Sequence, residues 1–263
     1  MSIVGRYKMS NNVIETLKNH RSIRRYEDRS VSEEKIEEIV EAGQQAPFVS
    51  QLYSVIIEKD KDKVPFGAPV LFTICVDIHK FEKIMEKRDW DLVTNDLTLL
   101  LFGIQDASYM AQNMVIAAES LDLGTCYLGS PVRTAKNLRK KFDLPDRVFP
   151  LVQLVIGHPD EDPPTRPRYP MDYVLFEDRY PTLSDESIED AMKEMDKGYL
   201  EQDYYKNLDA KISLKSKEED EYDYNTYSWT EHISRKWGQW YDDLESQKEI
   251  VCACGFKIDE TED

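Results

Sequence analysis

Residues 69–77, PVLFTICVD, decide the fold of this chain, because they are apolar without the alternation of a half-exposed strand. Such a run predicts a strand that is buried on both faces of a sheet. Residues 53–58, YSVIIE, and residues 149–159, FPLVQLVIGHP, predict two more strands. Residues 125–129, TCYLG, predict a short strand that runs into a turn. We therefore expect a small central sheet with both faces covered.

Helices are predicted between these strands. In SVSEEKIEEIVEAG (30–43), Ser32 is the predicted N-cap and Gly43 the predicted end of a helix. Residues from about 92 to 121 predict a long helix that is apolar on more than one side, which suits the centre of a fold or a dimer interface. TAKNLRKKF (134–142) is also helical in pattern. Strands alternating with helices favour an α/β or α+β sheet flanked by helices.

The composition changes after about Pro181, where the chain becomes charged, poor in aliphatic residues and rich in tyrosine. We therefore predict two domains, 1–180 and 181–263. The second is expected to be a C-terminal helical extension that packs on the core or on a partner subunit. It contains an amphipathic helix from about Trp229 and ends in the acidic tail IDETED (258–263).

Bulk composition excludes several classes of protein. The formal net charge of −17 disfavours a nucleic-acid partner, because the phosphate backbone repels such a surface. No apolar run approaches the roughly 20 residues that span a bilayer, and residues 1–20 are too polar for a secretory signal. The four cysteines have no disulfide-framework spacing, so a reducing cytoplasm is expected.

Positive charge gathers at one place in this acidic chain, NHRSIRRY (19–26). In extended backbone, alternate residues share a face, so an imidazole, a hydroxyl and a guanidinium would line one side of it. DPPTRPRYP (162–170) carries two arginines with the same period of two, in a segment stiffened by prolines. Such donors suit a phosphate monoester. The simpler interpretation is a set of surface ion pairs with Glu27 and Asp28.

Five stretches in the same order resemble the FMN-dependent nitroreductase family, and most closely its NADPH-preferring nitroreductase and flavin reductase branch. They are HRSIRRYEDRSVSEEKIEEIVEAGQQAP (20–47), SQLYSVII (50–57), AQNMVIAAESLDLGTCYLGS (111–130), LPDRVFPLVQLVIGHPDEDPPTRPRYP (144–170) and YSWTEHISRKW (227–237). The resemblance covers roughly residues 13 to 237. It implies an α+β fold with a mixed central sheet, a C-terminal helical extension and a homodimer.

The resemblance also implies an FMN site. The residues expected to hold the phosphate and ribityl oxygens are His20, Arg21, Ser22, Arg24, Arg166 and Arg168. Those expected to line the flavin from the partner subunit are Pro47, Phe48, Val49 and Gln51. Leu128, Gly129 and Ser130 are expected to place backbone groups near flavin N5 and O4, and a glycine there lets the backbone approach a ring closely.

The implied function is an NAD(P)H-dependent FMN oxidoreductase that works by a ping-pong mechanism. Its oxidant is expected to be a nitroaromatic, a quinone or free flavin. The flavin carries the chemistry, so no protein residue is nominated as an acid or base. The sequence leaves open the physiological oxidant and the choice between NADH and NADPH.

Two departures from the family keep a second hypothesis open, a flavin-binding sensor or partner-binding module with little turnover. Phe48 and Val49 stand where the family commonly has small hydroxyl residues, and residues 59–68 replace a longer helical insertion. Cys252 and Cys254 have no companion pair at metal-ligand spacing, so we expect no metal site.

Overall fold

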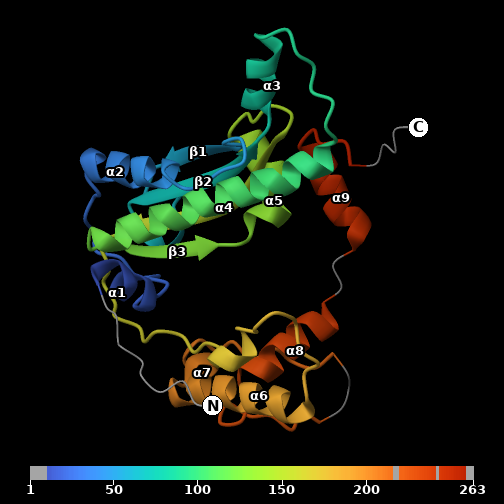
Figure 1. The fold of residues 1–263 in the computed structure, drawn as a ribbon. Helices are drawn as coiled ribbons and strands as arrows, with labels where there is room; N and C mark the ends of the chain where they lie inside the picture. The colour runs from blue at the N-terminus through green and yellow to red at the C-terminus, as the bar shows by residue number, and fades with distance from the viewer. Residues whose placement is uncertain (1–10, 216–218, 241–242, 259–263) are drawn as a thin grey trace. The chain divides into compact units, whose positions relative to one another are not determined.

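The computed structural model describes residues 11–215, 219–240 and 243–258 of the chain (Figure 1). The described residues form two compact units. The first comprises the residues up to Pro163 together with those from Leu244 onward, and the second comprises Pro164–Asp243. Each unit is described by itself below. The predicted domains 1–180 and 181–263 stay a prediction, and residues 259–263 of the predicted acidic tail lie outside the described part.

The first unit is built on a sheet of four strands in the order β1-β2-β4-β3 (Figure 1). Their bounds are Tyr53–Glu58 (β1), Val70–Asp77 (β2), Gly124–Leu128 (β3) and Val148–Gly157 (β4). All three ladders are antiparallel, and a single parallel bridge joins Ser22 to Thr125 beside β3. Every residue of β2 is buried, which confirms the prediction from its unbroken apolar run.

Helices α2 (Glu33–Gln44) and α4 (Asp96–Ser120) pack against each other, and α4 lies along the sheet (Figure 1). The predicted cap of α2 is confirmed, since the Ser32 hydroxyl accepts the Lys35 N–H at 3.3 Å. The predicted end at Gly43 is wrong by one residue, because Gly43 lies inside the helix. A Cβ at Gly43 would lie 2.7 Å from Cγ of Met114 in α4. The glycine therefore serves the close approach of two helices.

The opposite face of the sheet carries smaller apolar clusters. Val64 and Ala68 from the short 59–68 linker pack on Leu71, Cys126 and Val155, which come from three neighbouring strands. The linker forms one turn of 3-10 helix, Pro65–Gly67, in place of a helical insertion. Helix α5 (Pro131–Lys141) packs against β4.

The C-terminal part of the chain returns to the first unit. Helix α3 (His79–Glu86) follows β2 in the sequence. Near the end of the described chain, α9 (Leu244–Ala253) packs on α5. Cys254 and Phe256 are buried, and the Phe256 ring meets Phe149 edge to face at 6.4 Å between centroids. Asp96 at the start of α4 accepts the Lys257 N–H at 2.7 Å. These residues are therefore part of the core.

The second unit is helical and its interior is mainly aromatic. Its elements are a 3-10 turn, Met171–Tyr173, and helices α6 (Asp185–Glu201), α7 (Tyr204–Asn207) and α8 (Trp229–Gln239). Tyr205 stacks on His232 at 4.4 Å between centroids, and Tyr227 meets Tyr205 edge to face. Buried Arg235 forms ion pairs with Asp220 and Glu231. The predicted helix from Trp229 is confirmed.

The remaining described helix, α1 (Asn12–Lys18), is capped by Asn11, whose side chain accepts the Ile14 N–H at 3.0 Å. Among the described residues, none of the helices is both long and apolar enough to cross a bilayer. The predicted α+β fold with a central sheet flanked by helices and a helical extension is confirmed. A homodimer is not visible in a single chain.

Candidate functional site

The basic stretch is extended, as predicted, and lies between β3 and the segment that follows β4. The Ile23 N–H donates to the Thr125 carbonyl at 2.8 Å, next to the parallel bridge from Ser22. On the other side, the Asp160 N–H donates to the Arg25 carbonyl at 2.9 Å. Ile23 is buried, and a Cβ at Gly124 would lie 2.7 Å from it, so the stretch is held tightly against the sheet edge.

Two of its arginines are used in ion pairs. Arg21 pairs with Asp162 at 2.8 Å and Arg25 with Asp160 at 3.5 Å. The simpler interpretation of the sequence therefore holds for these two side chains, although their partners lie after β4 rather than at Glu27 and Asp28. Arg21 is half-buried and the other three groups are largely solvent-exposed, so the pairs contribute little to stability.

Arg24 is different. Its backbone N–H and that of Arg25 both donate to the Glu161 carboxylate, which fixes the backbone here. Within the described part of the chain, its guanidinium has no ion pair or hydrogen bond, so its donors are free for an anion. Burial raises the pKa of the nearby Cys126 thiol, and the positive charge of Arg24 and a hydrogen bond with Ser22 oppose that rise. Ser22 and Arg24 thus share the side of the stretch that faces Cys126.

His20 is oriented by a carboxylate. Its Nδ1 lies 2.6 Å from Oε1 of Glu119, which also accepts the Thr125 hydroxyl at 2.8 Å. A carboxylate acceptor requires that Nδ1 carry the proton. The imidazole is therefore held by α4 and β3 together.

Residues 128–130, the predicted flavin turn, lie at the end of β3. Because the basic stretch runs parallel to β3 from the Ser22–Thr125 bridge, Arg24 lies beside the end of β3 that leads into Leu128, Gly129 and Ser130. A Cβ built on Gly129 meets no atom of the chain within 4 Å. Packing within this chain therefore does not require the glycine, and the turn is open to a group from outside.

A hollow of about 640 Å³ lies on the other side of the stretch, beside Arg21 and Ile23. Its lining includes five carboxylates, those of Glu15, Glu119, Asp122, Glu161 and Asp162, and only the one guanidinium of Arg21. Such a lining repels a phosphate. An anion is therefore expected on the Ser22 and Arg24 side, and the role of Arg21 in holding the phosphate stays a prediction.

The predicted flavin-lining loop, residues 47–51, is held by a buried carboxylate of α4. Asp106 is fully buried and accepts the N–H groups of Val49 at 2.6 Å, Ser50 at 3.1 Å and Leu52 at 3.0 Å. The loop presents Phe48 and Val49 outward, each 51% exposed, and Pro47 and Gln51 are exposed as well. Sequence reasoning missed Asp106, although a lone acid within an apolar helix is a visible signal.

The two halves of the predicted flavin site lie at opposite edges of the same sheet. The 47–51 loop leads into β1, and the basic stretch and the turn at 128–130 flank β3. Three strand spacings separate β1 from β3, roughly 14 Å at ~4.8 Å each. The structure therefore brings Ser22, Arg24 and the 128–130 turn together within one chain, and it does not bring the 47–51 loop to them.

Arg166 and Arg168 belong to the second unit. Arg166 donates to Oε1 of Gln202 at 2.7 Å and lies 4.0 Å over the ring of Tyr204. Arg168 donates to the carbonyls of Arg166 and Pro167, each at 3.0 Å. Their expected convergence with Ser22 stays a prediction.

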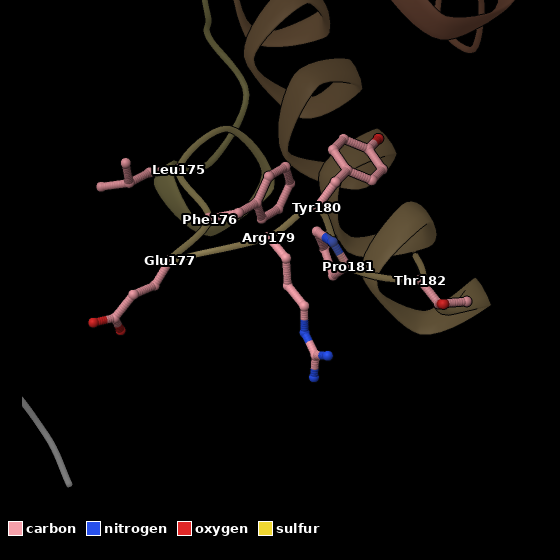
Figure 2. A pocket seen from close by; sticks show the side chains of 7 residues that line it. All are labelled: Leu175, Phe176, Glu177, Arg179, Tyr180, Pro181 and Thr182. Atoms are coloured by element: carbon pink, nitrogen blue, oxygen red, sulfur yellow. The ribbon is translucent and has the colours of Figure 1, made fainter.

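A second hollow, of about 660 Å³, lies in the second unit and is lined by residues 175–177 and 179–182 (Figure 2). Figure 2 shows the side chains of Glu177 and Arg179 extending outward from the loop rather than toward a common centre. None of the predicted site residues lines it. We assign it no ligand.

Cys254 is buried in the core of the first unit. Burial raises the pKa of the Cys254 thiol, which makes it a poor nucleophile. No group of three or more potential metal ligands occurs among the described residues.

Comparison with known proteins places these features in a family. The sequence profile of the Nitroreductase family matches residues 17–57 and 56–158. The chain is 35% identical to a Cr(VI) reductase of Pseudomonas sp. (strain G-1), over 71% of this chain and 83% of that protein. It is 32% identical to an FMN reductase (NADPH) of Bacillus subtilis (strain 168), over 74% of this chain and 84% of that protein.

The fold agrees with this comparison. The solved structure of B. megaterium NfrA2 superposes with a TM-score of 0.81 and 27% identity, covering 95% of this chain and all of that one. The family profile covers the basic stretch and all four strands of the sheet. The match of the whole fold leads to the same conclusion. The chain belongs to the Nitroreductase family.

Proposed function

We propose that this protein is an FMN-dependent oxidoreductase that takes hydride from NAD(P)H and reduces nitroaromatics, quinones or free flavin by a ping-pong mechanism. Family membership and the names of the relatives support this function. The observation that carries it is the guanidinium of Arg24, which has no ion pair or hydrogen bond to the described residues and is held beside Ser22 at the strand end that leads into Gly129.

The residues present fit FMN. The hydroxyl of Ser22 and the guanidinium of Arg24 offer donors to a phosphate, and the open turn at Gly129 admits a flat ring against the backbone. The exposed side chains of Phe48 and Val49 offer an apolar wall. We infer that Arg166 and Arg168 complete the phosphate site.

Bound FMN supplies the two-electron chemistry, and the protein supplies binding and orientation. Ser22 and Arg24 would hold the phosphate of bound FMN. Backbone groups of Leu128, Gly129 and Ser130, together with the positive charge of Arg24, would stabilise negative charge on the reduced ring. His20 is held by Glu119, so its position depends on α4 rather than on the cofactor.

We further propose a homodimer in which each flavin site draws on both subunits. The separation of the 47–51 loop from β3 within one chain supports this arrangement. The outward side of α4 supports it too, because Leu97 and Leu101 are each 53% exposed and Tyr109 is 46% exposed. A second copy of the chain would bury this apolar surface.

We also propose a reducing cytoplasm as the compartment, because the four cysteines have no disulfide-framework spacing in the sequence. A second candidate function is a flavin-binding module with little turnover. The observation that favours it is the apolar pair Phe48 and Val49, which offers no hydroxyl to the flavin.

Anaerobic reduction tests the proposal. Purified protein reconstituted with FMN should be yellow and should lose its visible flavin absorbance when NADPH or NADH is added. Yellow protein that neither nicotinamide bleaches would support the binding module instead. Protein that takes up no FMN would overturn both.

A further inference from the structure

The segment that presents Phe48 and Val49 has a single buried anchor. Three donors, the N–H groups of Val49, Ser50 and Leu52, converge on the two carboxylate oxygens of Asp106. Asp106 is 0% exposed, so water cannot replace these bonds. Hydrogen bonds to a buried charged group are stronger than neutral ones, and losing them leaves unsatisfied groups.

The Asp106 carboxylate makes its hydrogen bonds to this segment. Within the described part of the chain, Asp106 has no ion pair with a lysine, arginine or histidine. One turn earlier on α4, Gly103 faces the same segment, because a Cβ there would lie 2.3 Å from Val76 and 3.5 Å from the Leu52 carbonyl. The lack of a side chain at Gly103 therefore lets α4 lie close to the segment, within reach of Asp106.

The segment also needs an anchor because its backbone is not regular. Gln51, between the bound N–H groups of Ser50 and Leu52, has a φ of 54°, in the left-handed region that side chains rarely adopt. Such a conformation persists only where its surroundings hold it. The three bonds to Asp106 flank that residue on both sides.

We propose that Asp106 is the positioning residue for the apolar wall of the flavin site, acting through the backbone of residues 49–52 on Phe48 and Val49. This inference rests on the proposed function. Asp106 itself touches no cofactor. It sets where the two side chains are presented to the flavin of the partner subunit, and so it controls flavin affinity from the core of the donor subunit.

The test compares Asp106→Asn with Asp77→Asn in the full chain. Asparagine keeps the shape of Asp106 but replaces one acceptor oxygen with a donor, which faces at least one of the three N–H groups. Asp77 is a matched control, since it is also buried, at 4% exposed, and accepts hydrogen bonds from Ser54 and from the Lys80 N–H. Its side chain bonds to Ser54 in β1 and to the start of α3, whereas its contact with Leu52 is through the backbone N–H, which the substitution keeps.

Two readouts are measured on protein shown to be folded by circular dichroism. Hydrogen exchange of the apoprotein reports on a peptide covering residues 46–53, and we expect about tenfold faster exchange in Asp106→Asn only. Titration with FMN, followed by flavin fluorescence, should give a Kd about tenfold weaker for Asp106→Asn and unchanged for Asp77→Asn.

A double variant separates positioning from general loss of stability. If Asp106 acts through the loop, Phe48→Ala should weaken FMN binding in the wild type and add little in the Asp106→Asn background. Unchanged exchange at residues 46–53 overturns the inference. So does an FMN Kd equal to that of the wild type, or full additivity of the two substitutions. Wild-type protein that binds no FMN overturns the proposed function instead, and the exchange result then still reports whether Asp106 holds the loop.

Discussion

Replacing Arg24 by alanine tests the assignment of the phosphate site, because its guanidinium has no partner within the described chain. The substitution removes no internal ion pair, so the free energy of unfolding should change by no more than about 0.5 kcal/mol. A charge-assisted hydrogen bond to phosphate contributes about 1.5–3 kcal/mol. The Kd for FMN should therefore rise by about 10- to 150-fold.

Arg25→Ala is the matched control for this prediction. Arg25 is the next residue, carries the same charge and pairs with Asp160 on the surface. Its loss should change the FMN Kd only slightly, since exposed pairs contribute about 0–1 kcal/mol. Arg24→Lys should recover part of the affinity, because a lysine keeps the charge but not the planar fork of donors.

The assay is titration of apoprotein with FMN at two salt concentrations. Binding by the wild type should weaken as salt rises, and the slope should be smaller for Arg24→Ala, because one fewer charge meets the phosphate. Equal losses of affinity for Arg24→Ala and Arg25→Ala would refute the assignment. They would show that only the overall charge of the stretch matters.

Three further predictions concern the interface and the stability of each unit. Leu101→Glu on the exposed side of α4 should convert a dimer to a monomer of 30.8 kDa in light scattering and weaken FMN binding, and Val13→Glu on α1 should do neither. Burial lowers the pKa of His232 below 6.5, so the unfolded state takes up a proton first as the pH falls through that value. The second unit should therefore lose stability below about pH 6.5, and His232→Phe should flatten this dependence in tryptophan fluorescence. Arg147→Ala should destabilise the first unit in urea by about 3 kcal/mol, because it removes the ion partner of the buried Asp96 carboxylate and of the half-buried Glu82 carboxylate.

The strands and helix caps could be predicted because local pattern determines them. The unbroken apolar run of β2 and the side chain of Ser32 act through the residues beside them in sequence. The bounds of the strands accordingly agree with the prediction to within a residue or two at each end. The predicted helix end at Gly43 was wrong. The glycine lies inside the helix because it allows the close approach of Met114, which is far away in sequence.

The predicted site was harder to judge from sequence, because its contacts join residues that are far apart along the chain. Among the three arginines of the stretch, sequence could not show which would meet Asp160 or Asp162, since those partners come from beyond β4. Asp106 is visible in the sequence as an acid in an apolar helix, but its bonds to the 47–51 loop join residues more than 50 positions apart. The resemblance to the family indicated the site residues. The structure shows that Arg21 and Arg25 form ion pairs and that Arg24 has none to the described residues.

The burial of Cys254 and Phe256 in the first unit has a consequence for synthesis on the ribosome. That unit contains residues up to Pro163, but its core also needs side chains made almost a hundred positions later. A nascent chain that has emerged only through β4 exposes Phe149 without its ring partner. The core of the first unit can therefore be completed only after the intervening helices are translated, and until then this apolar surface is exposed to chaperones.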